Sequence, residues 1–390
     1  MKFTVGYNWD EELLDKIDYP EVNSLYAGLP TGAIGGGRAP LTIKNASEKK
    51  IKSDIKKVHD KGWEFNFTLN SGYLSNKEYT KEGHKEIIDY IGWVHDLGVD
   101  SVTVTLPSLI SLIKRYYPDL KVKISTFQRI TSVSMAKRFE DLGADAIMIC
   151  ENSNRDFKLL EGLRRAVDTK LILIANVGCA YYCHNAHSHI LSTAHSTQDC
   201  SSIFTAIPHV ADCLKIKLEN LNELIKVRFI RPEDVQIYED LGIDALKIVD
   251  RNTKTDILAK RVEAYHNRSY NGNLFHLLGQ TGGKKFNDIN EEEFKELFSQ
   301  GEEIKEKIYR FFGYLKYSVS DLVHIDNQKF PNNFLENFSK INCTTQSCDD
   351  CKYCSSIASK VITADQEKID LFINSLSSLK KELVEGSILY

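Results

Sequence analysis

The chain has 390 residues, which is room for two or three domains, or for one barrel of ~250 residues with an appendage. Hydrophobic residues make up 42% of it and charged residues 27%, with 22 glycines and 8 prolines, which excludes a disordered, collagen-like or coiled-coil protein. Fifty basic side chains against 54 acidic ones give a net charge of −4, so no broad positive surface is expected to hold nucleic acid or an anionic membrane.

Membrane insertion and secretion are not expected. No stretch approaches the ~18 uncharged apolar residues of a membrane span. After Lys2 the chain reads FTVGYNWDEE, which lacks the apolar core of a signal peptide. The predicted location is therefore the cytoplasm, with no membrane partner.

Short β-branched and aromatic runs alternate with amphipathic helical patterns over roughly the first 270 residues, as is typical of parallel βα units. The expected strands lie at 2–8, 22–28, 64–70, 101–106, 121–127, 146–150, 171–176, 226–230 (KVRFI) and 245–250. These nine are one more than a closed barrel of eight needs.

The joints before three of these strands repeat one device. The sequence Leu-Gly-x-Asp stands at 97–100, 142–145 and 241–244, each time between a helical pattern and a strand. Each glycine is expected to end a helix. The recurrence favours a TIM-like (β/α)8 barrel over an open doubly wound sheet, which could use the same device.

Barrel chemistry sits where strands end, in the loops that follow. The polar residues and glycines expected there are Gly28, the glycine-rich run 32–38, Asn70, Thr105, Ser125, Thr126, Glu151, Asn152, Asn176, Arg231, Asp250 and Arg251. The glycine-rich run has no Lys-Ser/Thr after it, so it is not a P-loop. It is either a mobile loop or an active-site loop that brings Arg38 to an anionic substrate.

Two parts of the chain leave the βα repeat. We expect a barrel over 1–275 with a cysteine-rich insertion at 178–223 on its C-terminal face, and a mostly helical extension over 285–390 with a cysteine run at 343–354. A helical pattern runs to about Glu385. Because the extension has few apolar positions, we expect it to need metal or docking to hold it.

Eight of the nine cysteines fall into two groups of four, which suggests metal. The first group is Cys179, Cys183, Cys200 and Cys213, and the second is Cys343, Cys348, Cys351 and Cys354. Thiolates select iron–sulfur clusters, zinc or copper(I), and the first group lacks the paired knuckles of structural zinc sites, which favours iron–sulfur. The second contains C-x2-C-x2-C, as in bacterial ferredoxins, so a second iron–sulfur cluster or a zinc ion is expected there. Reduced structural thiols are the alternative for both groups, and Cys150, at the end of an apolar strand, is expected to be a buried, inert thiol.

Histidines and lysines are also concentrated locally. His184, His187, His189 and His195 lie in the insertion, as proton-transfer groups or as solvated loop histidines. The densest lysine run, 44–57, is interrupted by Glu48 and Asp54, which favours a solvated amphipathic helix over a nucleic-acid patch.

Three segments resemble the peptidase U32 family, also called collagenase-like peptidases: NVGCAYYCHNAHSHI, ADCLKIKL and FIRPEDVQIYEDLGIDALKIVDRN. The resemblance covers about Lys2 to Tyr265, and Asp250 replaces the glycine usual in the family's K-I-x-G-R motif. It implies a TIM-barrel core with a 4Fe-4S cluster held by four cysteines. Family members take part in oxygen-independent hydroxylation of ubiquinone precursors or of tRNA and rRNA bases.

The leading functional hypothesis is thus an iron–sulfur enzyme that hydroxylates a small-molecule or RNA-base substrate without oxygen, or performs related redox or group-transfer chemistry, and that receives electrons from a donor or protein partner. Glu151 and His187 are the candidate proton-transfer groups, and Arg38 and Arg251 are candidates for binding an anionic group. One alternative is a non-catalytic iron–sulfur partner subunit or RNA-binding scaffold. A true peptidase is less favoured, because the chain has neither HExxH nor G-x-S-x-G.

Overall fold

A computed structural model describes residues 1–198, 207–279, 310, 313–315 and 317–387. The chain forms two compact units. The barrel unit comprises residues 1–177, 187–203 and 228–270, and the second unit comprises 178–186, 204–227 and 271–390. The expected domain boundaries stay a prediction. In these units, however, the insertion is divided, and much of it groups with the C-terminal extension. Cys200 and residues 285–309 of the extension lie outside the described residues.

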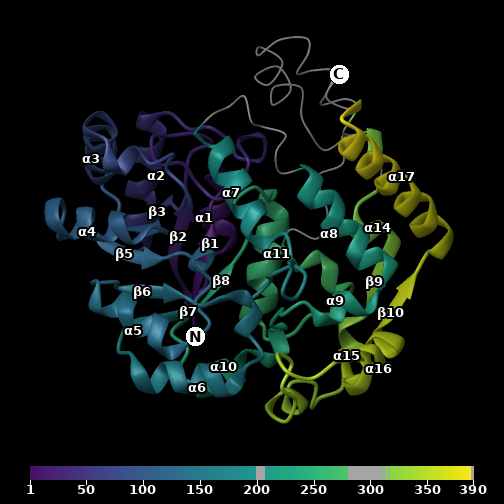
Figure 1. The fold of residues 1–390 in the computed structure, drawn as a ribbon. Helices are drawn as coiled ribbons and strands as arrows, with labels where there is room; N and C mark the ends of the chain where they lie inside the picture. Colours follow the sequence, from purple (N-terminus) through teal and green to yellow (C-terminus); the bar gives the residue numbers. More distant parts are fainter. Residues whose placement is uncertain (199–206, 280–309, 311–312, 316, 388–390) are drawn as a thin grey trace. The chain divides into compact units, whose positions relative to one another are not determined.

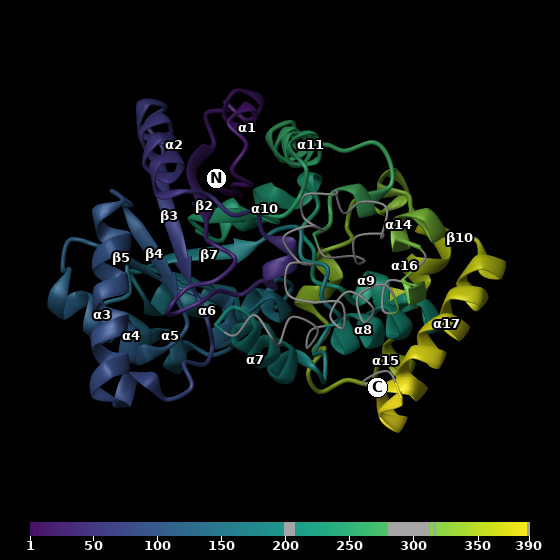
Figure 2. The same ribbon diagram turned by 90° about the horizontal axis from the view of Figure 1, so that it is seen from above.

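The barrel unit holds eight parallel strands that close in sequence order, which confirms the TIM-like barrel (Figure 1). The strands are β1 (Lys2–Gly6), β2 (Val22–Ala27), β3 (Glu64–Leu69), β4 (Ser101–Val104), β5 (Lys121–Ile124), β6 (Ala146–Met148), β7 (Lys170–Ile174) and β8 (Ala245–Ile248). The helices of this unit are α1 (Glu12–Lys16), α2 (Glu48–Asp60), α3 (Lys81–Asp96), α4 (Pro107–Tyr116), α5 (Val133–Asp141), α6 (Phe157–Ala166), α7 (Ala186–Ser196), α10 (Val235–Asp240) and α11 (Thr255–His266). Seen from above, α2, α3 and α4 lie outside the strands (Figure 2).

The repeated Leu-Gly-x-Asp joints end helices as expected. Gly98, Gly143 and Gly242 have φ of 85°, 94° and 78°, a left-handed conformation that glycine adopts without strain. The aspartates have a role that the sequence did not reveal. The Oδ2 atoms of Asp100, Asp145 and Asp244 accept hydrogen bonds from the backbone N–H of Phe65, Val122 and Leu171, at 2.7, 2.7 and 2.8 Å. Each joint therefore ties the start of its own strand to the neighbouring strand.

The ninth expected strand, KVRFI at 226–230, is wrong. Helix α9 (Asn222–Lys226) takes its first residue, and the remainder is not part of the sheet. β8 occupies the place beside β7, with Ala245 opposite Ile172. Side chains satisfy the carbonyls of the segment instead: Asn154 Nδ2 donates to Arg228 O at 2.8 Å and the Tyr265 hydroxyl donates to Ile230 O at 2.7 Å.

The second unit has a core to which both the insertion and the extension contribute. Its elements are α8 (Ile207–Glu219), α9, α14 (Val319–Leu322), β9 (Val323–Ile325), α15 (Cys348–Cys351), α16 (Tyr353–Val361), β10 (Ile362–Ala364) and α17 (Gln366–Glu385), and β9 and β10 pair antiparallel. Helix α17 ends at the residue where the sequence pattern placed the end. It packs on α8, and α16 packs on α9. The extension is thus held by docking on helices of the insertion, one of the two routes expected.

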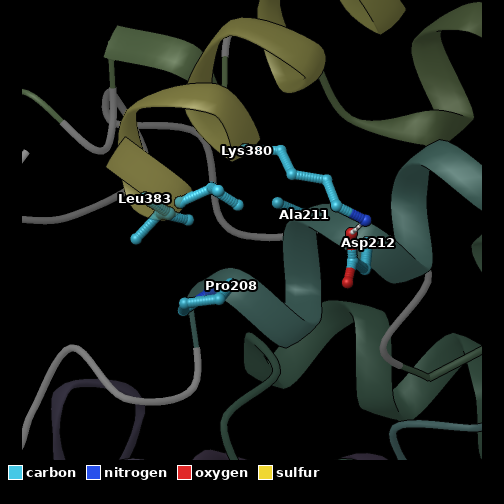
Figure 3. Close-up of a pocket in the computed structure, with 6 residues that line it drawn as sticks. Pro208, Ala211, Asp212, Lys380 and Leu383 are labelled. Atoms are coloured by element: carbon cyan, nitrogen blue, oxygen red, sulfur yellow. Dashed lines mark hydrogen bonds and ion pairs between the residues drawn. The ribbon is translucent and has the colours of Figure 1, made fainter. Parts of the chain in front are cut away.

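Helices α8 and α17 meet along a groove lined by both (Figure 3). Lys380 Nζ lies 3.1 Å from Asp212 Oδ1 at its edge. Beneath the surface, α17 buries Ile369, Phe372, Leu376 and Leu379 at a spacing of three or four residues, which is the apolar stripe of an amphipathic helix. Apolar packing therefore holds α17 more than its exposed ion pair does.

An aromatic group supports the second cysteine run. Phe330, Phe334, Phe338 and Tyr353 contact one another in edge-to-face and stacked pairs, with ring centroids 4.9 to 6.3 Å apart. The Tyr353 hydroxyl donates to Phe334 O at 2.8 Å. Because Tyr353 lies beside Cys354 in the chain, the cysteine run is anchored to a packed aromatic core.

None of the described helices is both long and apolar enough to cross a membrane.

Candidate functional site

The glycine-rich loop is fixed against the barrel unit. Gly36 N–H donates to Thr197 Oγ1 at 3.0 Å and Gly32 N–H donates to Thr197 O at 3.3 Å, at the end of α7. Gly35 has a φ of 74°, which favours glycine. These contacts hold the run beside the end of α7, and its role as an active-site loop stays a prediction.

Two of the candidate arginines meet at one aspartate beyond β8. Arg38, at the end of the glycine-rich loop, pairs with Asp250 through Nε and Oδ2 at 2.9 Å. Arg251, the next residue, donates from Nη1 to Thr68 Oγ1 in β3. The close approach of β1 to this turn requires glycine, because a Cβ on Gly6 would lie 2.7 Å from Arg251 N. Asp250 therefore stands at the centre of a charged site across the barrel mouth, which we call the strand-end site.

Arg231, also expected near a strand end, pairs with an aspartate. Arg231 forms a bidentate pair with Asp234, with distances of 2.8 and 2.7 Å. Asn176 likewise joins two strand ends, since its Oδ1 accepts from Val249 N–H at 2.8 Å and its Nδ2 donates to Val249 O. Both side chains make hydrogen bonds that fix the chain near the strand ends.

Glu151 follows β6 and is largely buried. Thr126 Oγ1 lies 3.0 Å from its Oε2, and Arg129 Nη1 lies 3.2 Å from its Oε1. The neighbouring Cys150 is fully buried, and this burial, with the adjacent Glu151 charge, raises the pKa of its thiol to about 12. The expectation of a buried Cys150 is confirmed, and its thiol is not poised to act as a nucleophile.

His187 is exposed in the first turn of α7, on a different segment from Glu151. Both candidate proton-transfer groups belong to the barrel unit and lie on different segments, and Glu151 contacts Thr126 and Arg129.

Sequence reasoning missed two lysines inside the barrel. Lys247 of β8 and Lys123 of β5 are buried. Lys247 Nζ lies 3.5 Å from Met148 Sδ, and burial, together with Arg251 and Arg38, lowers the pKa of Lys247 to about 7. The period of two along ALKIVD could have located it, because Lys247 alternates with Leu246 and Ile248 and so points inward.

Residues flanking the first cysteine group tie its segments together in the second unit. Lys217 Nζ, on α8, donates to Gly178 O, next to Cys179. Asn185 Nδ2 donates to Asp212 Oδ2 at 3.2 Å, which joins the other end of the segment to the residue before Cys213. These two contacts hold the segment that carries Cys179 and Cys183 against the helix that carries Cys213.

The second cysteine group lies at a helix corner. Cys348 and Cys351 begin and end α15, Lys352 adopts a left-handed conformation with φ 53°, and Cys354 is in the first turn of α16. Lys226 of α9 contacts Glu223 at 2.6 Å and lies in the neighbourhood of Cys348 and Cys354.

The eight cysteines other than Cys200 are not joined in disulfides within the described residues. Within the described part of the chain, no three His, Cys, Asp or Glu side chains are gathered closely enough to hold a metal ion. The ligand sets thus stay predictions.

The model of peptidase family U32 matches residues 20–309, which is most of the chain. The chain belongs to peptidase family U32. Among curated relatives, this U32 protein is 28% identical over 299 residues to "Uncharacterized protease MJ1657" of Methanocaldococcus jannaschii, covering 71% of this chain and 85% of that protein.

Solved structures similar to this U32 protein include one described as "The Structure of the U32 Peptidase Mk0906". It is 18% identical, has a TM-score of 0.48, and the match covers 63% of this chain and 90% of that chain. A second, described as "Native KDPGal structure", is 10% identical with a TM-score of 0.36, and the match covers 68% and 92% of the two chains.

Proposed function

We propose that this U32 protein is an iron–sulfur enzyme in which Cys179, Cys183, Cys213 and Cys200 hold a 4Fe-4S cluster. Its proposed activity is oxygen-independent hydroxylation, or related redox or group-transfer chemistry, on a small-molecule or RNA-base substrate. A second 4Fe-4S cluster or a zinc ion is proposed for Cys343, Cys348, Cys351 and Cys354, and an electron donor or protein partner is expected.

The observation that carries this proposal is the pair of contacts around the first cysteine group. Cys179 and Cys183 lie between Gly178 and Asn185, and both of these residues are bound to α8 within one turn of Cys213. The two chain segments that carry Cys179, Cys183 and Cys213 are thereby tied to each other. The donor set fits an iron–sulfur cluster, because soft thiolate sulfur is the ligand that iron–sulfur clusters take.

A bound 4Fe-4S cluster would supply one-electron transfer or, at an iron site left open, Lewis acidity. The chain's own residues have separate roles. Glu151, oriented by Thr126 and Arg129, can hold or release a proton at its carboxylate. The strand-end site around Asp250 can orient a substrate across the barrel mouth.

Anaerobic purification followed by iron and sulfide analysis tests the proposal. We expect a brown protein with about eight iron atoms per chain if both groups hold 4Fe-4S, or about four with one zinc ion. The Cys213→Ser variant should lose about four iron atoms. The Cys150→Ser variant is the matched control, because its thiol is buried in the barrel unit, and it should retain them.

A colourless preparation that contains only zinc would refute the proposal, as would full iron retention in Cys213→Ser. Peptide cleavage that survives removal of iron would favour a peptidase instead. Iron retention without any redox or group-transfer activity would favour the partner-subunit alternative.

A further inference from the structure

Arg251 crosses the mouth of the barrel while buried. It follows β8, yet its guanidinium reaches Thr68 in β3, on the far side of β1 and β2. The residue is 5% exposed, and its Nε has no hydrogen-bond partner among the described residues. A buried guanidinium with an unsatisfied N–H is costly, because its five donors need acceptors once water is excluded.

Two glycines let the backbone approach this guanidinium closely. A Cβ added to Gly28 would lie 3.0 Å from Arg251 Nη1 and 2.3 Å from Thr68 Oγ1. A Cβ added to Gly36 would lie 3.3 Å from Arg251 Nη2. A side chain at position 28 or 36 would therefore crowd the guanidinium.

Several charged groups act on Arg251. Its pKa is lowered to about 10, first by burial and then by Arg38, whereas Asp250 opposes the shift. The same Asp250 is paired with Arg38 and also acts on Arg261 and Lys247. Asp250 thus acts on the charges of three arginines and a lysine at the barrel mouth.

A buried amide oxygen beside the guanidinium also lacks a hydrogen-bond partner among the described residues. Asn70 Oδ1, beyond β3, has no hydrogen bond in the described structure, while Nδ2 of the same side chain donates to Ser125 Oγ at 3.3 Å. The Cβ position of Gly36 lies between the two groups, 3.9 Å from Asn70 Oδ1 and 3.3 Å from Arg251 Nη2. A ligand here meets a donor on one side and an acceptor on the other.

We propose that Arg251 and Asn70 form a binding subsite for a phosphate-type oxyanion of the substrate, with the anionic oxygens on Arg251 and an O–H group of the same ligand on Asn70 Oδ1. Arginine matches the geometry of such oxyanions with paired N–H donors. Because the subsite is buried, it takes the terminal phosphate of a small molecule rather than the internal phosphodiesters of an RNA strand. The inference rests on the proposed function only in that the substrate lies over the strand ends.

Titration of the full chain with inorganic phosphate, followed by calorimetry, tests the subsite. Arg251→Gln should weaken phosphate binding at least about tenfold, the loss expected for a charge-assisted hydrogen bond. Arg165→Gln, which removes an exposed positive charge from α6, should leave it unchanged. Should Arg251→Gln fail to fold, Gly36→Ala gives the answer, because its methyl group crowds Nη2 without removing charge, and it should also weaken binding.

Equal phosphate affinity in the wild type, Arg251→Gln and Gly36→Ala would overturn the proposal, and so would the absence of phosphate binding. Displacement of phosphate by an RNA oligomer that has no terminal phosphate would overturn the small-molecule assignment. The titration is repeated after iron removal, and phosphate binding that persists shows that the subsite does not depend on iron. If the chain proves to bind no iron at all, phosphate binding would keep the subsite while the cluster proposal fails.

Discussion

The Nζ atom of Lys247 lies 3.7 Å from the centre of the Tyr26 ring, inside the barrel. The ring face offers a weak partner to an ammonium group, but Arg251 and Arg38 oppose a further positive charge nearby. Burial contributes most to lowering the pKa of Lys247 from 10.5 to about 7. The barrel interior therefore favours the neutral amine of Lys247 over its charged form.

Replacing this lysine should stabilise the protein in a pH-dependent way. The unfolded chain binds the Lys247 proton more tightly than the folded chain, so the wild-type free energy of unfolding rises with pH between about 7 and 10.5. At ~1.4 kcal/mol per pH unit, Lys247→Met should be more stable than the wild type by about 4 kcal/mol near pH 7, and this difference should shrink toward pH 10.5. Denaturant unfolding across this range measures it. Lys52→Met, at an exposed position of α2, is the control. A stability difference between Lys247→Met and the wild type that does not change with pH would contradict the prediction.

The aspartates of the Leu-Gly-x-Asp joints should stabilise the barrel through their hydrogen bonds to the neighbouring strand, and Asp145 provides the test. Asp145 accepts from Val122 N–H and also pairs with Lys114 Nζ at 2.7 Å. Asp145→Ala leaves that buried-strand N–H without its partner, which should cost about 1–3 kcal/mol in denaturant unfolding. Asp141→Ala, on the exposed end of α5, is the matched control and should change the free energy of unfolding by less than about 0.5 kcal/mol. Equal effects of the two variants would show that the hydrogen bond is not stabilising.

Local patterns predicted most of the barrel. The period of two and the glycine stops located eight of its strands, because each βα unit solves the same local packing problem. These patterns failed at KVRFI, because the pattern of a short run does not distinguish a strand from a buried segment outside the sheet. Two carbonyls of this segment accept hydrogen bonds from the side chains of Asn154 and Tyr265, which the sequence does not show. The lysines of the α2 run form ion pairs along the helix, such as Lys52 with Glu48, as expected for a solvated face.

Long-range docking was outside the reach of the sequence. The extension packs on α8 and α9, which lie more than 100 residues before α16 and α17, so its own sequence does not show the surface on which it docks. For the same reason the sequence located the thiols of the first cysteine group but not Lys217 and Asn185, whose contacts exist only after α8 folds.

Lys217 should tune the proposed cluster as well as position its ligands. It is 1% exposed on α8, one turn beyond Cys213. A buried cation stabilises the more negative reduced state of a nearby cluster. Lys217→Met should therefore lower the reduction potential by an amount on the order of tens of millivolts in a spectroscopic redox titration. Lys217→Arg should restore most of it, whereas an unchanged potential in Lys217→Met with iron retained would exclude this role.

The packing of α17 should govern both the stability of the second unit and its iron content. Leu379 is fully buried on the face of α17 that carries Phe372 and Leu376, while its neighbour Lys380 makes an exposed pair with Asp212 (Figure 3). Leu379→Ala should cost about 2–5 kcal/mol, because it opens a cavity in the core. Lys380→Ala should cost less than about 1 kcal/mol, since exposed ion pairs contribute little.

Because α17 packs on α8, and α8 carries Cys213, Leu379→Ala should also lose iron faster than the wild type or Lys380→Ala during mild urea treatment. Equal stability of the two variants would mean that α17 does not support α8, and equal iron loss despite a large stability difference would separate the cysteine site from the packing of the extension.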